Sequence, residues 1–428
     1  MAFIVLSFVS TAFFTVACSC LETGICQNSD QAATVSKLGA KNIRTEFGIG
    51  TAANSMRTMI GAIASGGARV SPLAGFDAIP SDGQAQNLGT WASEFGPGGS
   101  FWSGRSDGNL AMRYIEFGNE NSYSYKRPSG DYYAFGQQYA TQFKKAAIAI
   151  RTANPQVGLL CQADDGNTGS SAWVDGMFNA VPDLASYVAG WVIHPYGPGW
   201  QARMDRMINQ LAAHGAAPSS TIPMFITEWG ISTDNGRTLS NNYGFPTNMT
   251  YQQAADALHA AVYAMVARYN QRLRMFLIYN GHDDQASGAG TDREWYFGCL
   301  KVDLTDKGAY STEARALFAN PPCGVSVALP TMTGSASTRV LRITNNVVNG
   351  TVTVGYNLDK GQNVQLVVYD CRGRRACSLI NKWQAAGKYE ALWGNSRGLG
   401  APVSGVYFIR LDARDVYQTA AVAVCNSR

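Results

Sequence analysis

Two glutamates each stand at the end of an apolar run. In "RYIEFGNEN" (113–121), apolar and charged residues interleave as in a strand, and Glu120 follows directly after Gly-Asn. In "PMFITEWG" (223–230), the apolar run ends at Glu228. Two carboxylates can cleave a glycosidic bond, because one protonates the leaving oxygen while the other acts on the sugar carbon. When they lie about 5–5.5 Å apart, the second attacks directly and the anomeric configuration is retained.

The two carboxylates would need different protonation states. The acid needs a raised pKa, whereas the nucleophile must stay ionised. A cationic neighbour such as Arg44 would hold one glutamate charged, and repulsion between the carboxylates would help keep the other protonated. Glu120 and Glu228 are far apart in the sequence, so the fold must bring them together.

The segment from residue 36 to about residue 320 alternates strand patterns with helical patterns. This alternation predicts βα units and a parallel sheet. Seven strands are recognisable, and an eighth, first strand must lie upstream of Leu38. The predicted strands are 41–47, 68–75, 112–120, 157–164, 188–197, 223–230 and 274–281, and helical patterns include 30–40, 56–67, 131–154, 201–215 and 250–270.

This pattern favours a (β/α)8 TIM barrel over residues 21–320. No glycine-rich phosphate turn follows the first clear strand, which argues against an open doubly wound sheet. In such barrels the chemistry takes place where the strands end, at the C-terminal face. Candidate residues at predicted strand ends are Arg44, Glu120, Asp164, His194, Tyr196, Glu228, Tyr279 and His282.

The last quarter of the chain changes character. Residues 321–338 are rich in Pro, Gly, Ser and Thr, which predicts a linker. From 339 to 428, short alternating strands are separated by frequent turns, which is typical of a small all-β Ig-like sandwich.

The first segment, 1–20, is apolar for most of the way from Ala2 to Ala17. Its length predicts a secretion signal rather than a membrane span. Two alternatives remain, a lipid anchor at Cys18 and a strand of the mature barrel. The net charge is +4 and charged residues make up 15% of the chain. Without a basic cluster interleaved with aromatics, we expect no nucleic-acid partner and favour a secreted or cell-surface protein.

Nine cysteines are scattered along the chain without paired CxxC motifs or a His partner. This spacing argues against a zinc site, and we expect neither a metal nor an organic cofactor. Cys371 and Cys377 flank "RGRRA" and could form a disulfide across a hairpin. Two free thiols on adjacent strands are the equally weighted alternative.

The strand ends together resemble those of clan A glycoside hydrolases, the retaining (β/α)8 enzymes with glutamates after strands 4 and 7. The resemblance lies in the ordered segments "LGAKNIRTEF", "IEFGNEN", "VIHPYG" and "FITEWG", and xylosidase- and endoglycosidase-like families look nearest. It implies that Glu120 is the acid/base and Glu228 the nucleophile. Asn119 would contact the sugar 2-hydroxyl, Tyr196 would steady the nucleophile, and Glu116 would be a buried supporting carboxylate.

The resemblance also implies a substrate site on the same face. Strand 8 of the clan commonly ends in a Trp under the sugar, but here the segment is "LIYNGHDD", so Tyr279 or Trp295 would take that place. The other predicted substrate-binding residues are Arg44, Asn119, His194, Tyr196, Trp229 and His282. Aromatic residues in nearby loops are expected to stack on sugars: Trp102, Tyr123, Tyr125, Tyr132 and Trp200.

The tail segment 367–411 resembles an Ig-like module of the flagellar hook-capping protein and the C-terminal sorting domain of the type IX secretion system. The matching positions include Tyr369, Gly373, Trp393, Gly405 and Tyr407. This resemblance implies export or surface attachment, with the secretion machinery as a partner. A passive spacer is the alternative.

The sequence therefore predicts a secreted glycosidase that hydrolyses O-glycosidic bonds, of β configuration, in a poly- or oligosaccharide by double displacement. An inverting or transglycosylating relative is one alternative. The others are a carbohydrate-binding or surface protein on a barrel that no longer turns over, and an adhesin that acts through its tail.

Overall fold

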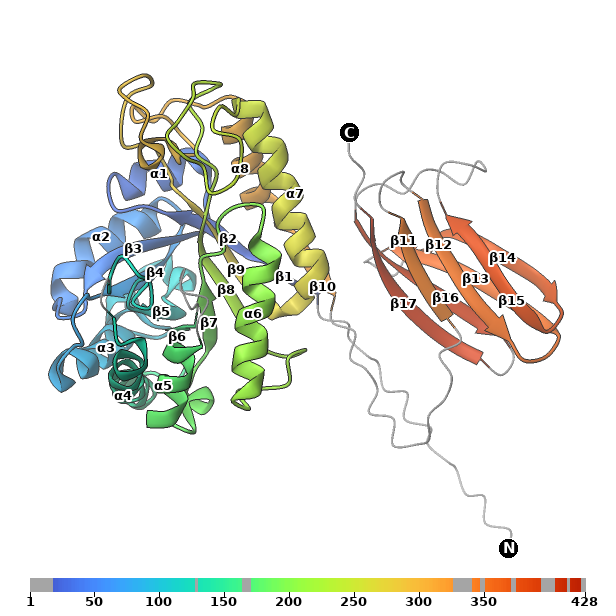
Figure 1. The fold of residues 1–428 in the computed structure, drawn as a ribbon, viewed down its shortest axis with the longest axis horizontal. Coiled ribbons are helices and arrows are strands. Elements are labelled where there is room, and N and C mark those ends of the chain that lie inside the picture. Colours follow the sequence, from blue (N-terminus) through green and yellow to red (C-terminus); the bar gives the residue numbers. More distant parts are fainter. Residues whose placement is uncertain are drawn as a thin grey trace, which may run out of the picture. The chain divides into compact units, whose positions relative to one another are not determined.

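The computed structural model describes residues 18–127, 130–163, 171–325, 341–346, 351–370, 375–393, 405–413 and 416–424. The chain divides into two compact units, one formed by Cys20–Pro322 and the other by the residues outside that range (Figure 1). Within the described residues, no helix combines the length and apolarity that crossing a bilayer requires.

The larger unit is a closed barrel, as the alternating pattern predicts. Within the described residues, eight parallel strands follow one another in sequence order around it. The last closes on the first, with Met275 opposite Glu22. The strands are β2 (Glu22–Cys26), β3 (Asn42–Gly48), β4 (Arg69–Gly75), β5 (Tyr114–Phe117), β6 (Gly158–Gln162), β7 (Gly190–Ile193), β8 (Met224–Trp229) and β9 (Leu273–Tyr279).

The eighth strand that had to precede Leu38 is β2. Its five residues, "ETGIC", carry little strand signal of their own because Gly24 interrupts them. The glycine is required, since a Cβ at this position would lie 1.9 Å from the Asn42 carbonyl oxygen of β3. The close approach of the two strands therefore explains the weak pattern.

Helices surround the barrel strands in Figure 1. The helical patterns correspond to α1, α2, α4, α6 and α7, whereas the pattern analysis did not single out α3, α5 or α8. Capping boxes begin α3 at Ser81 and α7 at Thr250. The helices are α1 (Gln31–Leu38), α2 (Ala53–Ser65), α3 (Asp82–Phe95), α4 (Tyr132–Ala153), α5 (Ala172–Ala180), α6 (Trp200–Ala213), α7 (Tyr251–Tyr269) and α8 (Ala309–Ala319).

The barrel has two apolar layers. A large core fills the space between strands and helices. A smaller cluster comes from alternate positions of the strands, so that Leu160 belongs to it while its neighbours Leu159 and Cys161 belong to the outer core. This inner cluster fills the barrel as packed side chains rather than as a pore. Its members are Cys26, Leu160, Val192, Phe225, Met275 and Leu277.

The chain entering and leaving the barrel forms a small two-stranded sheet of β1 (Cys18–Cys20) and β10 (Cys323–Val325). Cys20 is disulfide-bonded. The predicted secretion signal lies outside the described residues up to residue 17, and its last three residues form β1. The predicted linker begins with β10, and its remainder, 326–338, lies outside the described residues.

The described part of the tail forms two small antiparallel sheets, ordered β11-β12-β15 and β14-β13-β16-β17. Both contribute to one hydrophobic core that contains Val354 and Trp393 from the first sheet and Leu366 and Ile409 from the second. The alternating patterns at 351–358, 363–370, 388–393, 404–412 and 418–424 predict strands that correspond to β12, β13, β15, β16 and β17, whereas no pattern predicted β11 or β14. The strands are β11 (Leu341–Asn346), β12 (Thr351–Leu358), β13 (Gln362–Asp370), β14 (Arg375–Gln384), β15 (Gly387–Trp393), β16 (Gly405–Ala413) and β17 (Val416–Val424).

Cys377 tests the predicted disulfide with Cys371. This residue lies in β14 as a free, half-buried thiol. A disulfide between Cys371 and Cys377 is therefore wrong as a prediction, and Cys371 itself lies outside the described residues.

Candidate active site

The chain leaves β5 through a tight turn that presents Glu120. The strand ends at Phe117, and both Gly118 (φ +77°) and Glu120 (φ +50°) adopt left-handed backbone conformations. A Cβ at Gly118 would lie 2.0 Å from the Asn121 side-chain oxygen and 2.9 Å from the Phe76 ring. The glycine therefore permits the turn, and the turn places Glu120 at the C-terminal face of the barrel.

Glu228 reaches the same face from β8. It is the fifth of six residues in that buried strand, and its side chain is 11% exposed. A carboxylate oxygen of Glu120, one of Glu228 and a ring nitrogen of His194 all lie within 4.8 Å of one another. The barrel thus brings together the two glutamates that the sequence paired. The short separation suits direct attack by a carboxylate, because an inverting pair stands about 6.5–9.5 Å apart to admit a water.

Arg44, on β3, connects the carboxylates below the surface. Its Nε and Nη2 donate to the two carboxylate oxygens of Glu116 at 2.7 and 2.9 Å, and its Nη1 donates to Glu228 Oε1 at 2.5 Å. Nη2 also donates to Asn119 Oδ1 at 2.8 Å. Burial disfavours the charged guanidinium, but the neighbouring charges of Glu116 and Glu228 outweigh it, so the pKa of Arg44 lies well above its usual value.

Glu116 occupies the buried supporting position. Its side chain is 2% exposed, and it accepts hydrogen bonds from Arg44 and from Gln162 Nε2 at 2.8 Å. A carboxylate so enclosed is available to orient the guanidinium but not to meet a substrate. Gln162 is a member of this network that the sequence analysis did not single out, although it lies at the end of β6, where the barrel rule directs attention. The candidate Asp164 lies outside the described residues.

His194 follows β7 and bonds to Glu120. Its Nδ1 lies 2.9 Å from Glu120 Oε1, while Nε2 lies 2.9 Å from Thr227 Oγ1. Burial lowers the pKa of His194, but Glu228 and Glu120 raise it by more, so the net shift is upward. Burial raises the pKa of Glu120, yet the His194 contact reverses this and lowers it. The expectation of a raised pKa on Glu120 is therefore wrong, because the interactions with His194, Tyr125 and Arg44 outweigh burial.

Two tyrosine hydroxyls complete the hydrogen bonds of the glutamate pair. Tyr196 donates to Glu228 Oε2 at 3.2 Å, and Tyr125 donates to Glu120 Oε2 at 2.5 Å. Each of the four oxygens of Glu120 and Glu228 thus has a hydrogen-bond partner. Tyr125 was expected among stacking aromatics, and the structure instead places its hydroxyl on Glu120.

Aromatic rings gather on the Glu228 side of the site. The Tyr196 ring stacks on Tyr243 with centroids 4.7 Å apart and meets the edges of Tyr279 and Phe297 at 6.3 and 5.9 Å. Tyr279 ends β9, where the clan resemblance expects Trp, and Tyr279 and Asn280 are joined by a cis peptide bond. Tyr243 and Phe297 were missed, because they lie in loops where periodicity gives no signal.

Three other predicted substrate contacts differ in their exposure. Trp229 is fully buried, with its ring near Phe276 at 5.7 Å, because its side chain faces away from that of Glu228. The buried His282 ring contacts Gln27 and Ser29 at 2.9 and 3.2 Å, and so joins the loops after β9 and β2. Trp295 is half-buried on a short 3-10 helix, Arg293–Tyr296, with its ring beside Tyr296.

The Glu120, His194 and Glu228 ligand atoms are close enough for a cation. Every carboxylate oxygen of the pair, however, already accepts a hydrogen bond, and the Arg44 guanidinium supplies positive charge to Glu228. We therefore do not assign these residues as metal ligands.

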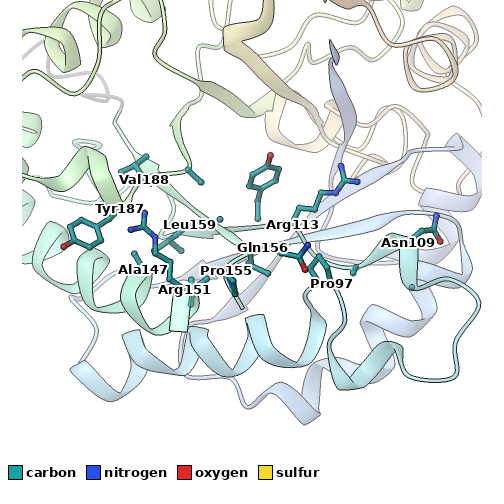
Figure 2. Close-up of a pocket in the computed structure, with 17 residues that line it drawn as sticks. Pro97, Asn109, Arg113, Ala147, Arg151, Pro155, Gln156, Leu159, Tyr187 and Val188 are labelled. Carbon is teal, nitrogen blue, oxygen red and sulfur yellow. The ribbon is translucent and has the colours of Figure 1, made fainter. Parts of the chain in front are cut away.

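A separate pocket of about 680 Å³ lies at the other end of the barrel strands (Figure 2). Tyr114 and Gly158, which begin β5 and β6, line it together with Arg113, Arg151 and Tyr187. Because parallel strands begin at one face and end at the other, this pocket is distinct from the site around Glu120 and Glu228.

Comparison with known proteins returns glycoside hydrolases among solved structures. A calcium-binding mutant of β-glucuronidase 2 from Bacteroides uniformis is 14% identical, with a TM-score of 0.45 over 95% of this chain and 45% of that chain. A family 39 glycoside hydrolase from Bacteroides cellulosilyticus is 15% identical (TM-score 0.49; 87% and 81% covered). An endo-β-1,4-mannanase from Thermotoga petrophila is 11% identical (TM-score 0.43; 96% and 99% covered).

The chain spans slightly less than half the length of the glucuronidase structures that it matches. No family model matches the sequence, and no curated protein does.

Proposed function

We propose that this protein is a retaining glycoside hydrolase that cleaves β-linked glycosides of a poly- or oligosaccharide. The observation that carries the proposal is the approach of the Glu120 and Glu228 carboxylates to within 4.8 Å at the C-terminal face of the barrel. Each carboxylate has its own set of donors, so the two are chemically distinct.

In the first step, a Glu228 oxygen attacks the anomeric carbon and the bond to the leaving oxygen breaks. Arg44 and Tyr196 orient Glu228 through their hydrogen bonds to its two oxygens. The leaving oxygen needs a proton, and Glu120, which contacts His194 at 2.9 Å, is proposed to supply it. Glu120 delivers that proton to the leaving group.

In the second step, Glu120 takes a proton from water, and the resulting hydroxide displaces Glu228 from the sugar. Two inversions at the same carbon give net retention. Asn119, which Arg44 fixes through its side-chain oxygen, is proposed to contact the sugar 2-hydroxyl. Tyr279 and its aromatic neighbours are proposed to form the platform for the sugar ring.

The test is hydrolysis of a panel of β-linked polysaccharides and 4-nitrophenyl glycosides. Glu228→Ala is expected to lose roughly 10⁴-fold or more in kcat, and Glu120→Ala about 10²–10⁴-fold, least for the best leaving groups. Azide should rescue both, giving a glycosyl azide of retained configuration with Glu120→Ala and of inverted configuration with Glu228→Ala.

Glu46→Ala is the matched control, because Glu46 is an exposed glutamate near the end of β3. It should retain wild-type rates. Activity that survives both active-site substitutions would overturn the proposal. Saccharide binding without hydrolysis across the panel would instead favour a carbohydrate-binding protein.

We also propose that residues 1–20 direct secretion and that the tail is an Ig-like sorting module read by the secretion machinery. The tail's two facing sheets around one core are compatible with such a module. Deleting residues 339–428 should leave turnover within about twofold but retain the protein inside the producing cell. Unchanged export after this deletion would favour the passive-spacer alternative.

A further inference from the structure

Tyr125 makes an unusual contact for an exposed aromatic residue. Its side chain is 59% exposed, yet its hydroxyl donates to Glu120 Oε2 at 2.5 Å. The residue lies in the irregular segment between β5 and α4, with its ring edge-on to Tyr123. A short hydrogen bond from a neutral donor to a carboxylate is among the stronger kinds in proteins.

The two oxygens of Glu120 have hydrogen-bond partners that differ in solvent exposure. Oε1 faces His194, whose side chain is 1% exposed and is held from behind by Thr227. Oε2 faces Tyr125, which solvent reaches freely. A leaving group that takes a proton from Glu120 needs one of these oxygens, and only the exposed donor can withdraw without opening the core.

We propose that Tyr125 is a positioning residue for Glu120: its hydroxyl occupies the outer oxygen of Glu120 in the free enzyme and gives way to the leaving-group oxygen of the glycoside. This inference rests on the proposed function in assigning Glu120 as the acid/base. No bond is formed or broken by Tyr125, and its own proton stays on its hydroxyl.

The hydrogen bond from Tyr125 acts in opposite senses in the two steps. It favours the carboxylate form of Glu120, which is needed as the base in the second step. It opposes the protonated form, which is needed as the acid in the first. Its direction agrees with the lowered pKa of Glu120, to which His194 and then Tyr125 contribute against burial.

Other ionisable groups also surround Glu120, and a test must separate their effects. Lys126 lies 5.9 Å from the Tyr125 ring centre, and Glu116 stands 3.9 Å behind His194. The remaining groups facing Glu120 are Arg44 from β3, His194 from β7, Glu228 from β8, and the hydroxyls of Tyr196 and Tyr243. Tyr125→Phe removes one hydroxyl and leaves all of these in place.

The first experiment is carbon-13 NMR of protein labelled at the glutamate side-chain carboxyl carbon, titrated with pH. The Glu120 signal is assigned by its loss in Glu120→Gln. In Tyr125→Phe this carbon should titrate about one pH unit higher, corresponding to a tenfold change in the ionisation constant. Tyr133→Phe, an exposed tyrosine on α4, is the matched control and should titrate as wild type. Identical titration in Tyr125→Phe and wild type would overturn the proposal.

The second experiment measures kinetics on the oligosaccharide that wild type hydrolyses best, because its poor leaving group depends on protonation by Glu120. In Tyr125→Phe the basic limb of kcat/KM should move to higher pH by about one unit, without loss of kcat/KM at the optimum, while kcat falls where the second step limits turnover. A parallel fall of kcat and kcat/KM with unmoved limbs would overturn the proposal and make Tyr125 a sugar contact. If wild type hydrolyses nothing but the NMR difference is present, the proposed function fails while Tyr125 stands as the donor that positions Glu120.

Discussion

Two groups of buried ion-paired residues in the barrel unit differ in how exposed their carboxylates are. Arg44 is shared by Glu116 and Glu228, and the second of these is 11% exposed. Lys307 donates to Asp283 Oδ1 and to the Tyr296 carbonyl oxygen, each at 2.9 Å, and is fully enclosed. Arg44 holds Glu228, which keeps some exposure to solvent, whereas Lys307 and Asp283 only join the loop after β9 to the segment before α8.

The pKa values of Asp283 and Glu120 also shift in opposite directions. Burial raises the pKa of Asp283 to about 6, although Lys307 lowers it in part. At Glu120 burial is outweighed by its donors and the pKa falls. A buried charge therefore does not mark an active site by itself. An active-site carboxylate is instead expected to bond to a buried group and to keep part of its side chain accessible to solvent.

Arg44→Met should give the largest effect, because it leaves Glu116 and Glu228 buried without a cation. We expect a destabilisation of about 3–5 kcal/mol and a loss of activity of about 10³-fold or more, since Glu228, the proposed nucleophile, loses its orienting donor. Urea unfolding and turnover of the folded fraction measure the two. Turnover near the wild-type rate would show that the pair is only structural.

Lys307→Met tests the buried pair of Lys307 and Asp283 in the same way. Asp283 would remain buried without its cation, so we again expect about 3–5 kcal/mol of destabilisation. The folded fraction, however, should keep kcat within about tenfold. The double variant Lys307→Met with Asp283→Leu should recover stability, because replacing a buried pair by apolar residues is often neutral or stabilising. A loss of kcat as large as that of Arg44→Met would contradict the view that Lys307 and Asp283 serve only stability.

Ionisation of Asp283 should make the free energy of unfolding depend on pH. Its carboxyl titrates near 3.9 when unfolded and at about 6 when folded. Between these values the folded state binds the additional proton, so stability falls as pH rises from about 4 to 6, by about 3 kcal/mol. The difference between wild type and the double variant, measured by urea unfolding at several pH values, isolates this contribution. A flat difference would contradict it.

Tyr196→Phe should give the smallest effect. It removes the 3.2 Å hydrogen bond to Glu228 Oε2 but keeps the ring that stacks on Tyr243. We expect kcat/KM to fall about tenfold with little change in the unfolding midpoint. Tyr187→Phe, beside the pocket at the opposite end of the barrel, is the control and should change neither quantity.

The position of the paired glutamates was predictable because a barrel of parallel strands collects strand ends at one face. Arg44, Glu120, His194, Tyr196 and Glu228 are distant in sequence yet meet there. The barrel itself followed from the alternation of strands and helices. Only β2 escaped the pattern, because a five-residue strand with a central glycine resembles a loop.

Side-chain direction was less predictable. The sequence offered Trp229 as a sugar contact, although its adjacency to Glu228 already implied that it faces the opposite side of the strand. The positions of Tyr125, Tyr243 and Phe297 depend on loop conformations, which no periodic pattern encodes. In the tail, β14 was missed because its residues are mostly half-exposed and do not alternate clearly.

The left-handed backbone at Glu120 has an evolutionary consequence. A side chain other than glycine at φ +50° costs of order 1–2 kcal/mol, and glycine or asparagine would relieve much of it. Replacing Glu120 by glycine would relieve this backbone cost but would leave Nδ1 of the buried His194 without its partner. The strain at Glu120 is therefore retained together with the His194 contact, and a descendant that loses one of the two residues is expected to lose the other.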